Sequence, residues 1–284
     1  MEELFNPSKP YLAAWTWIHD VDLYDDQSGD DDQSGGIREP INSHRERPRL
    51  LKATALYYAA LCGFSGLTNY LITTHGENVH AQCGKHGSPL HAASYKGDLD
   101  AVRLLLSHGA DINTTAGKYG GTPLCSAYDG GHLDAMRLLL EHGADVDACY
   151  NLRWDRLLHL ASLKGDVDLT RLLLQHNADV NARDNIEETP LHNASINGHA
   201  NVTQLLLEHG ADVNARNLWF CTPLYRASKN GCLEVVQLLL GHGADVHLRG
   251  ENDRIPDRTP FQVATEEGHV EIAQLLLEHG AERE

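Results

Sequence analysis

The sequence predicts an all-α solenoid of seven helix–turn–helix units preceded by an N-terminal capping helix. Three observations predict this fold: a repeat of 33 to 34 residues, helix-start signals at the same place in each repeat, and apolar residues at helical spacing behind those signals. The units begin near residue 50 and cover about four-fifths of the 284 residues. Because a solenoid grows by adding units, this length does not require a division into globular domains.

Each unit opens on a Thr-Pro-Leu-His-like tetrad, which predicts the start of a short helix. Thr is a good N-cap residue because its hydroxyl accepts a hydrogen bond from an unpaired backbone N–H, and Pro fits the first helical position. The tetrads begin at Thr54, Ser88, Thr122, Arg156, Thr189, Thr222 and Thr259. The last step is longer than the others, and we expect its insertion, Arg249 to Arg258, on the loop side of the solenoid.

Glycine and histidine predict where the helices of a unit end. The first helix should end at a Gly, which occurs at Gly63, Gly97, Gly131, Gly165, Gly198, Gly231 and Gly268. The second helix carries its apolar residues three or four positions apart and ends in His-Gly-Ala-Asp. Gly there supplies the left-handed conformation, and the fourth unit has Asn177 instead, the next-best residue for it.

A single unit cannot bury its own apolar helix faces, so neighbouring units must stack. Burying one Leu stabilises the fold by about 1.5–3 kcal/mol, and each unit offers several. The core therefore needs neither a metal nor a disulfide. The six cysteines form no CxxC pair, which favours a reducing intracellular compartment, the cytoplasm with the nucleus left open.

The net charge of −17 argues against two classes of partner. Binding to nucleic acid requires clustered Lys and Arg, and an anionic membrane surface repels an acidic chain. The sequence has no run of 18 apolar residues, and its N-terminus does not resemble a signal peptide. We therefore expect an intracellular monomer that binds neither nucleic acid nor membrane.

The repeat resembles the ankyrin repeat. The segments that carry the resemblance are Ser88-Pro-Leu-His-Ala-Ala93, Gly198-His199 and Leu205-Leu-Leu-Glu-His-Gly-Ala-Asp-Val-Asn-Ala215. The resemblance implies helix–turn–helix units with protruding loops. It also implies a protein partner that lies across the loop tips and the inner surface of the first helices.

A second resemblance covers residues 6–18 and 54–66. Asn6-Pro-Ser-Lys-Pro-Tyr-Leu-Ala-Ala-Trp15 and Leu56-Tyr-Tyr-Ala-Ala-Leu-Cys-Gly63 are similar to the entry of ankyrin arrays in fungal NACHT-type receptor proteins. That resemblance implies an alternative function, the ligand-sensing arm of a signalling receptor. The sequence contains no GxxxxGK[ST] loop, so the nucleotide-binding half of such a receptor is not part of it.

The sequence divides into three parts. Residues 1–24 form a capping segment whose short helix, Pro10 to Ile18, is expected to cover the first unit. Residues 25–49 contain a repeated Asp-Asp-Gln-Ser-Gly motif and a basic linker, a composition typical of disorder. A calcium loop is the alternative for the acidic motif, but the DxDxDG order and the closing Glu are missing. Residues 50–284 carry the seven repeats.

Eighteen histidines raise the question of a metal or catalytic site. Most of them recur at fixed positions of the repeat, in the tetrad, after the inter-helix Gly or before the last Gly. Equivalent residues of successive units lie about one repeat apart, too far for a shared metal ion. No HExxH or GxSxG motif is present. We therefore expect no enzyme activity, no metal and no cofactor.

The candidate partner-binding residues are the aromatic, basic and apolar residues that the repeat does not require. Exposed aromatic side chains and Arg often carry most of the energy of an interface. In the loops they are Lys85, Lys118, Tyr119, Arg153, Trp154, Ile186, Trp219 and Phe220. On the inner helices they are Tyr95, Lys96, Leu163, Lys164, Ile196 and Lys229.

This surface is basic or apolar on an acidic protein, which predicts a partner segment that is acidic and has apolar anchors. The alternative for Trp154 and Trp219 is that both pack under neighbouring loops. The function predicted from the sequence is a non-catalytic protein–protein interaction scaffold or adaptor that binds its partner through a concave face and the loop tips.

Overall fold

The structure is a computed structural model. It describes residues 54–82, 84, 86–116, 121–148, 156–252 and 255–283. The predicted capping segment (1–24) and the acidic and basic segment (25–49) lie outside the described residues. Residues 52–284 form one compact unit.

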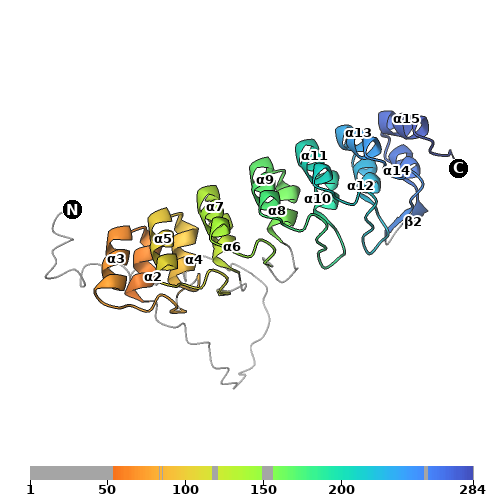
Figure 1. The fold of residues 1–284 in the computed structure, drawn as a ribbon. Coiled ribbons are helices and arrows are strands. Elements are labelled where there is room, and N and C mark those ends of the chain that lie inside the picture. The colour runs from red at the N-terminus through yellow and green to blue at the C-terminus, as the bar shows by residue number, and fades with distance from the viewer. Residues whose placement is uncertain are drawn as a thin grey trace, which may run out of the picture. The chain divides into compact units, whose positions relative to one another are not determined.

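The described residues form seven consecutive helix pairs (Figure 1). The first helices are α2 (Ala55–Cys62), α4 (Pro89–Lys96), α6 (Pro123–Asp129), α8 (Leu157–Lys164), α10 (Pro190–Ile196), α12 (Pro223–Lys229) and α14 (Pro260–Glu266). The second helices are α3 (Ser65–Thr73), α5 (Leu99–Ser107), α7 (Leu133–Glu141), α9 (Val167–Gln175), α11 (Ala200–Glu208), α13 (Leu233–Gly241) and α15 (Val270–Glu278). Each pair is one predicted unit, which confirms the helical solenoid.

The first helices begin at the tetrads. The Thr222 hydroxyl accepts a hydrogen bond from the backbone N–H of Tyr225 at 3.1 Å, and Thr259 accepts one from Gln262 at 3.2 Å. Unit four differs, because Arg156 occupies the N-cap position of α8 and makes no capping hydrogen bond. A missing cap costs about 1 kcal/mol, so α8 depends more on packing than the other first helices do.

Glycine between the two helices is required for two reasons. Gly97 and Gly165 have φ angles of +73° and +71°, a left-handed conformation that a side chain disfavours. A Cβ atom on Gly97 would also lie 2.5 Å from the His132 ring, and one on Gly165 would lie 2.5 Å from the His199 ring. The glycine of one unit therefore makes room for the histidine of the next.

The second helices end as the sequence predicts. The glycine that follows the helix adopts a left-handed conformation, with φ of +82° at Gly109 and +83° at Gly243. Asn177 takes this conformation in unit four, with φ of +61°. Asn accepts it at lower cost than most side chains, which explains the exchange.

The core lies between neighbouring units. Successive first helices pack against one another from α2 to α6 and from α8 to α14, and the second helices form a row beside them (Figure 1). Leu90, Leu105, Leu139, Leu206 and Leu239 are fully buried in these layers. Each unit thus buries its apolar face only by stacking on its neighbours.

The insertion between units six and seven folds into a small hairpin. Strand β1 (Gly250–Asn252) pairs antiparallel with β2 (Ile255–Arg258), and Gly250 lies opposite Arg258. A Cβ atom on Gly250 would lie 2.9 Å from the Cys221 sulfur and 3.0 Å from the Cys221 Cα. The hairpin can therefore lie this close to the preceding loop only with Gly at this position.

Candidate functional site

Histidines of the tetrads hold the loops between units. His192 donates a hydrogen bond from Nε2 to the carbonyl oxygen of Cys221 at 3.0 Å, and its Nδ1 accepts one from the backbone N–H of Thr189 at 3.1 Å. His91 makes the equivalent two bonds in unit two. Burial lowers the pKa of both imidazoles to about 4, so both are neutral at pH 7.

Histidines at the other repeat positions also bond to the backbone. A histidine that precedes the last Gly donates from Nδ1 to the carbonyl four residues earlier, as His209 does to Leu205 at 2.8 Å. A histidine that follows the inter-helix Gly reaches the preceding unit, as His199 does to the Leu163 carbonyl at 3.0 Å. Within the described ranges, no three His, Cys, Asp or Glu side chains are grouped to hold a metal ion.

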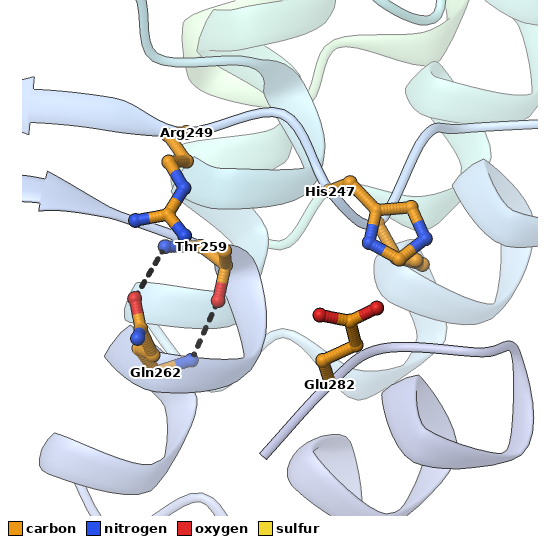
Figure 2. Close-up of a pocket in the computed structure, with 6 residues that line it drawn as sticks. His247, Arg249, Thr259, Gln262 and Glu282 are labelled. Atoms are coloured by element: carbon orange, nitrogen blue, oxygen red, sulfur yellow. Dashed lines mark hydrogen bonds between the residues drawn. The ribbon is translucent and has the colours of Figure 1, made fainter. Parts of the chain in front are cut away.

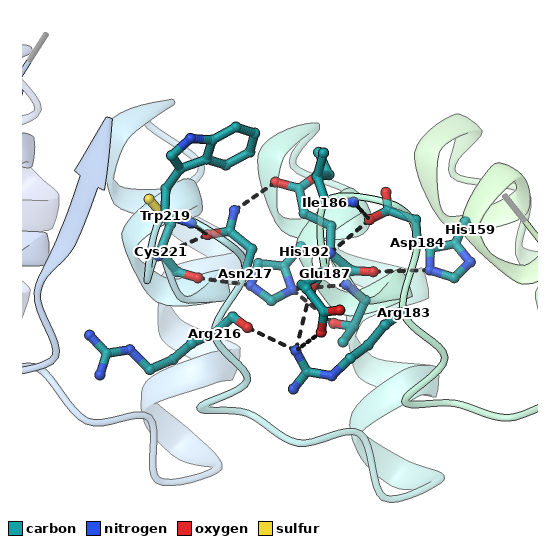
Figure 3. A network of polar contacts seen from close by, with 12 residues as sticks. His159, Arg183, Asp184, Ile186, Glu187, His192, Arg216, Asn217, Trp219 and Cys221 are labelled. Carbon is teal, nitrogen blue, oxygen red and sulfur yellow. Dashed lines mark hydrogen bonds and ion pairs between the residues drawn. The ribbon is translucent and has the colours of Figure 1, made fainter. Parts of the chain in front are cut away.

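Two consecutive loops form the same short finger, which we name finger A (Asp184–Glu188) and finger B (Asn217–Cys221). In finger B, the Asn217 Oδ1 accepts hydrogen bonds from the backbone N–H groups two and four residues later, both at 3.0 Å. Asp184 does the same in finger A, at 2.9 and 2.8 Å (Figure 3). Asp and Asn favour such turns because the side chain can replace a backbone acceptor.

The fourth residue of each finger has a left-handed backbone. The φ angle is +62° at Glu187 and +56° at Phe220. This conformation costs a residue other than Gly roughly 1–2 kcal/mol. Phe220 is 51% exposed, so burial of its ring does little to offset the cost. Backbone strain of this kind is concentrated at functional sites.

The two fingers are fastened to each other and to the helices below them. The backbone N–H of Leu218 donates to the carbonyl of Ile186 at 3.1 Å. The Asn217 amide donates to the Glu188 carboxylate at 3.0 Å, and His159 donates from Nε2 to the Glu188 carbonyl at 3.1 Å (Figure 3). With their backbone groups bonded, the fingers present fixed side chains to solvent.

A buried ion pair connects finger A to α12. The Glu188 carboxylate contacts the Arg226 guanidinium through the same oxygen that accepts from the Asn217 amide. The side chains of Glu188 and Arg226 are only 10% and 21% exposed. Because removing two charges from water offsets much of their attraction, this network contributes more to the position of the fingers than to net stability.

Trp219 of finger B packs inward. Its indole lies against a small buried cluster made of Cys221, Tyr225 and Val263, and the Arg226 guanidinium lies 6.0 Å from its ring centroid. The side chain thus covers part of the core between units six and seven. This packing favours the alternative expectation for Trp219, a structural role under a neighbouring loop.

Three arginines recur at a spacing of 33 residues just before the fingers and the hairpin; we name Arg183, Arg216 and Arg249 the arginine row. Arg183 donates from Nη1 to the carbonyl of Arg216 at 2.9 Å, and Arg216 donates from Nη2 to the carbonyl of Arg249 at 2.9 Å. Figure 3 shows Arg183 reaching the backbone of Arg216. Each arginine therefore links its own loop to the loop of the next unit.

A cavity of about 230 Å³ lies beside Arg249, between the loop of unit six and unit seven (Figure 2). It is lined by Val246, His247, Arg249, Thr259, Gln262 and Glu282. Small-molecule sites usually occupy about 300–1,000 Å³ and have mostly apolar walls. This smaller cavity has a guanidinium, an imidazole and a carboxylate in its wall, so we assign it no ligand.

The paired helices, the tetrad histidines and the protruding loops agree with what a comparison with known protein families finds. A family model described as ankyrin repeats (3 copies) matches residues 38–116, 56–149, 157–250 and 220–284. These matches together cover well over half of the chain. The chain belongs to the ankyrin-repeat family. The resemblance stated from the tetrads and the His-Gly-Ala-Asp segments is thereby confirmed.

The ankyrin array exposes only some of the residues predicted to bind a partner. The predicted residues Lys85, Lys118, Tyr119, Arg153 and Trp154 lie outside the described residues. Exposed side chains among the remainder are Tyr95, Lys96, Leu163, Lys164 and Phe220. Partly buried side chains are Ile186, Ile196, Trp219 and Lys229.

The described residues of this set fall into two rows. Ile186 and Phe220 lie in the fingers, at the N-terminal ends of α10 and α12. The others lie at or next to the C-terminal ends of first helices, and we name them the helix-end row: Tyr95, Lys96, Leu163, Lys164, Ile196 and Lys229. A helix of seven residues is about 10 Å long, so one first helix separates the rows. The two rows thus lie at opposite ends of the first helices and do not form one patch.

Two residues of the helix-end row are held by neighbouring side chains. The Tyr95 ring stacks on the His86 ring with 4.2 Å between their centroids. The Lys164 ammonium lies 4.7 Å from the centroid of the Tyr128 ring, and the Tyr128 hydroxyl raises the pKa of Lys164. Both side chains are therefore fixed within the array while part of their surface stays exposed.

Sequence reasoning missed two features of this surface. Leu218 of finger B is 56% exposed and was not singled out, although the apolar Ile186 of finger A was. The arginine row was also missed. Its signal was available, since Arg follows the Val-Asn-Ala segment, or its counterpart, in three successive units.

Proposed function

We propose that this chain is a non-catalytic protein–protein interaction scaffold that binds its partner through the two fingers and the helix-end row. Ankyrin repeats are generally protein–protein interaction modules. The observation that carries the proposal is finger B, whose backbone is held by Asn217 while Leu218 and Phe220 remain 56% and 51% exposed. Fixed, exposed apolar side chains cost little conformational entropy when a partner covers them.

The partner we propose is a protein segment that is acidic and has apolar anchors. The fingers combine exposed apolar side chains with the guanidinium groups of the arginine row, on a chain whose net charge is −17. Complementary charge of this kind increases the association rate and selects among partners.

The absence of catalysis is part of the proposal and has a physical reason at the buried histidines. Both ring nitrogens of His91 and of His192 are bonded within the fold, and their pKa values of about 4 keep them neutral. A general base needs a nitrogen that can reach a substrate proton. The receptor-arm alternative depends partly on Asn6–Trp15, which lies outside the described residues.

We place the protein inside the cell, in the cytoplasm or the nucleus, as a monomer. Among the described residues, Cys62 and Cys232 form no disulfide, a state that a reducing compartment preserves. Repulsion between copies that each carry a charge of −17 favours the monomer. In the part of the chain that the structure describes, no helix has both the length and the apolar character to cross a bilayer.

Affinity capture from the native cell tests the proposed function. We expect a protein that binds the wild-type chain to lose binding at least about tenfold with Leu218→Asp, because the substitution buries a charge at the interface. The matched control is Val270→Asp, which also replaces an exposed apolar side chain by Asp, at a residue that is 75% exposed on α15. Retention of the captured protein by Leu218→Asp would remove the fingers from the interface.

A further inference from the structure

We propose that the arginine row and finger B together bind an extended acidic segment of the partner, with one carboxylate on Arg216 and a neighbouring apolar side chain on Phe220 and Leu218. The proposal rests on the proposed function and specifies the recognition chemistry. It follows from three observations: the carboxylates already present in the row, the fixed position of Arg216, and the exposed apolar pair beside it.

The chain itself supplies carboxylates to the two ends of the arginine row. Glu187 pairs with Arg183 at 3.1 Å, and Asp257 pairs with Arg249 at 3.5 Å. Among the described residues, Arg216 in the middle has no carboxylate partner. The row thus holds carboxylates at both ends, and its centre is where an external carboxylate fits.

Arg216 is held in place before any partner arrives. Its Nε donates to the carbonyl of Phe220 at 3.3 Å, and its Nη2 donates to the carbonyl of Arg249 at 2.9 Å. The guanidinium also lies 4.9 Å from the centroid of the Phe220 ring. Among the described residues Nη1 has no acceptor, so it can donate to a carboxylate with little further loss of side-chain entropy.

The apolar half of the site lies in the same finger. Phe220 and Leu218 are both more than half exposed, and the Phe220 ring lies against the Arg216 guanidinium. Because Arg216 stacks on this ring, a carboxylate and an apolar side chain close together in one segment can be bound at once. This two-point chemistry selects an acidic residue next to Leu, Ile or Phe.

A nucleic acid is the other polymer that an arginine row can bind. Phosphate chains bind through many cations at once and are repelled by a protein with a net charge of −17. In this row the chain's own carboxylates already oppose two of the three arginines, and an apolar pair adjoins the third. The surface therefore fits a peptide better.

The test is selection from a display library of random twelve-residue peptides against the full chain. We expect the enriched peptides to carry Asp or Glu within two positions of Leu, Ile or Phe. Arg216→Glu and Phe220→Gly should each weaken binding of a selected peptide about tenfold or more. Raising the salt concentration should weaken binding to the wild type and have less effect on Arg216→Glu.

The matched control is Arg171→Glu, the same charge reversal at an exposed residue of the second helix α9. It should leave peptide affinity unchanged. The proposal is overturned if the enriched peptides are not acidic, if Arg171→Glu weakens binding as much as Arg216→Glu, or if a single-stranded twelve-nucleotide probe binds more tightly than the selected peptides.

The effects of Leu218→Asp and Arg216→Glu on a captured cellular protein distinguish this inference from the proposed function. If a captured cellular protein loses binding with Leu218→Asp but not with Arg216→Glu, the scaffold function stands and the acidic recognition is wrong. If neither substitution affects the captured protein, the fingers are not the interface and both proposals fail.

Discussion

At the scale of single residues, the repeat holds histidine, a side chain that is often reactive in other proteins, in a buried and fully hydrogen-bonded state. His192 is buried, and both of its ring nitrogens bond to backbone groups, one in its own unit and one in the next. The opposite case is Phe220, which is exposed and holds an unfavourable backbone conformation. The first residue serves the fold, and the second belongs to the binding site that we propose.

The buried histidines predict a loss of stability in acid. Their pKa of about 4 lies below the value of about 6.5 for an unfolded chain, so their contribution is complete above pH 6.5 and is lost as the pH falls toward 4. The shift corresponds to roughly 3 kcal/mol for each histidine. Urea unfolding of His192→Gln between pH 7 and pH 4 should show a smaller slope with pH than the wild type.

Asn185→Gln is the control for this experiment. Asn185 is exposed in finger A, and the substitution changes no titratable group, so it should leave the pH dependence of the wild type unchanged. Equal slopes for His192→Gln and the wild type would mean that the His192 ring is not held neutral by the fold.

Phe220→Gly should make the protein more stable although it removes an aromatic side chain. Gly adopts a φ of +56° without the penalty of roughly 1–2 kcal/mol that Phe bears, and the ring is only partly buried. Thermal unfolding should show a higher midpoint for Phe220→Gly and for Glu187→Gly. Leu218→Gly, in the same finger but without a positive φ, should lower it.

At the scale of elements, loops of successive units are joined by a series of asparagine bonds. The Asn181 Oδ1 accepts from the backbone N–H of Asp212 at 2.8 Å, and the Asn214 Oδ1 accepts from Asp245 at 2.9 Å. These Asn residues belong to the Val-Asn-Ala segment of the repeat. The helices stack through apolar contacts, and these bonds set how the loops line up.

Asn181→Ala should loosen one such junction without unfolding the units. Removal of a hydrogen bond of this kind costs about 1 kcal/mol. The Asp212 amide, which loses its acceptor, should exchange its hydrogen faster than in the wild type. Asn185→Ala, at an exposed position of finger A, is the control and should leave that exchange rate unchanged.

At the scale of the whole molecule, stability arises between neighbours, because the main helix–helix contacts among the described residues lie within a unit or between adjacent units. A substitution in one layer therefore weakens the units beside it more than distant ones. This differs from a globular domain, in which one core is shared by all elements. We therefore expect groups of adjacent units to unfold separately, without cooperative unfolding of the whole array.

Leu206→Ala tests this behaviour. Leu206 is fully buried in α11, between α9 and α13, and such a substitution costs about 3–5 kcal/mol. Hydrogen exchange should become faster in units four to six, whereas units one and two should change little. Leu276→Ala in the last unit should affect only units six and seven. Uniformly faster exchange along the array would show a single cooperative unit instead.

The sequence by itself determined the repeat and most of its local structure. The signals for this local structure are the N-cap Thr residues, the left-handed Gly residues with Asn177, and the tetrad histidines. Each of them makes its contacts within a few residues or one repeat along the chain, so the sequence alone reveals it. The hairpin strands in the insertion were not predicted beyond a loop-side position, because three or four residues carry too little pattern.

Only the tertiary structure decided which loop residues remain available to a partner. Trp219 and Phe220 are adjacent aromatic residues, yet Trp219 packs on Tyr225 and Val263 while Phe220 points to solvent beside Arg216. The difference depends on the neighbouring finger, the hairpin and α14, which come from other units. A side chain's exposure is set by contacts between units, and one unit's sequence does not contain them.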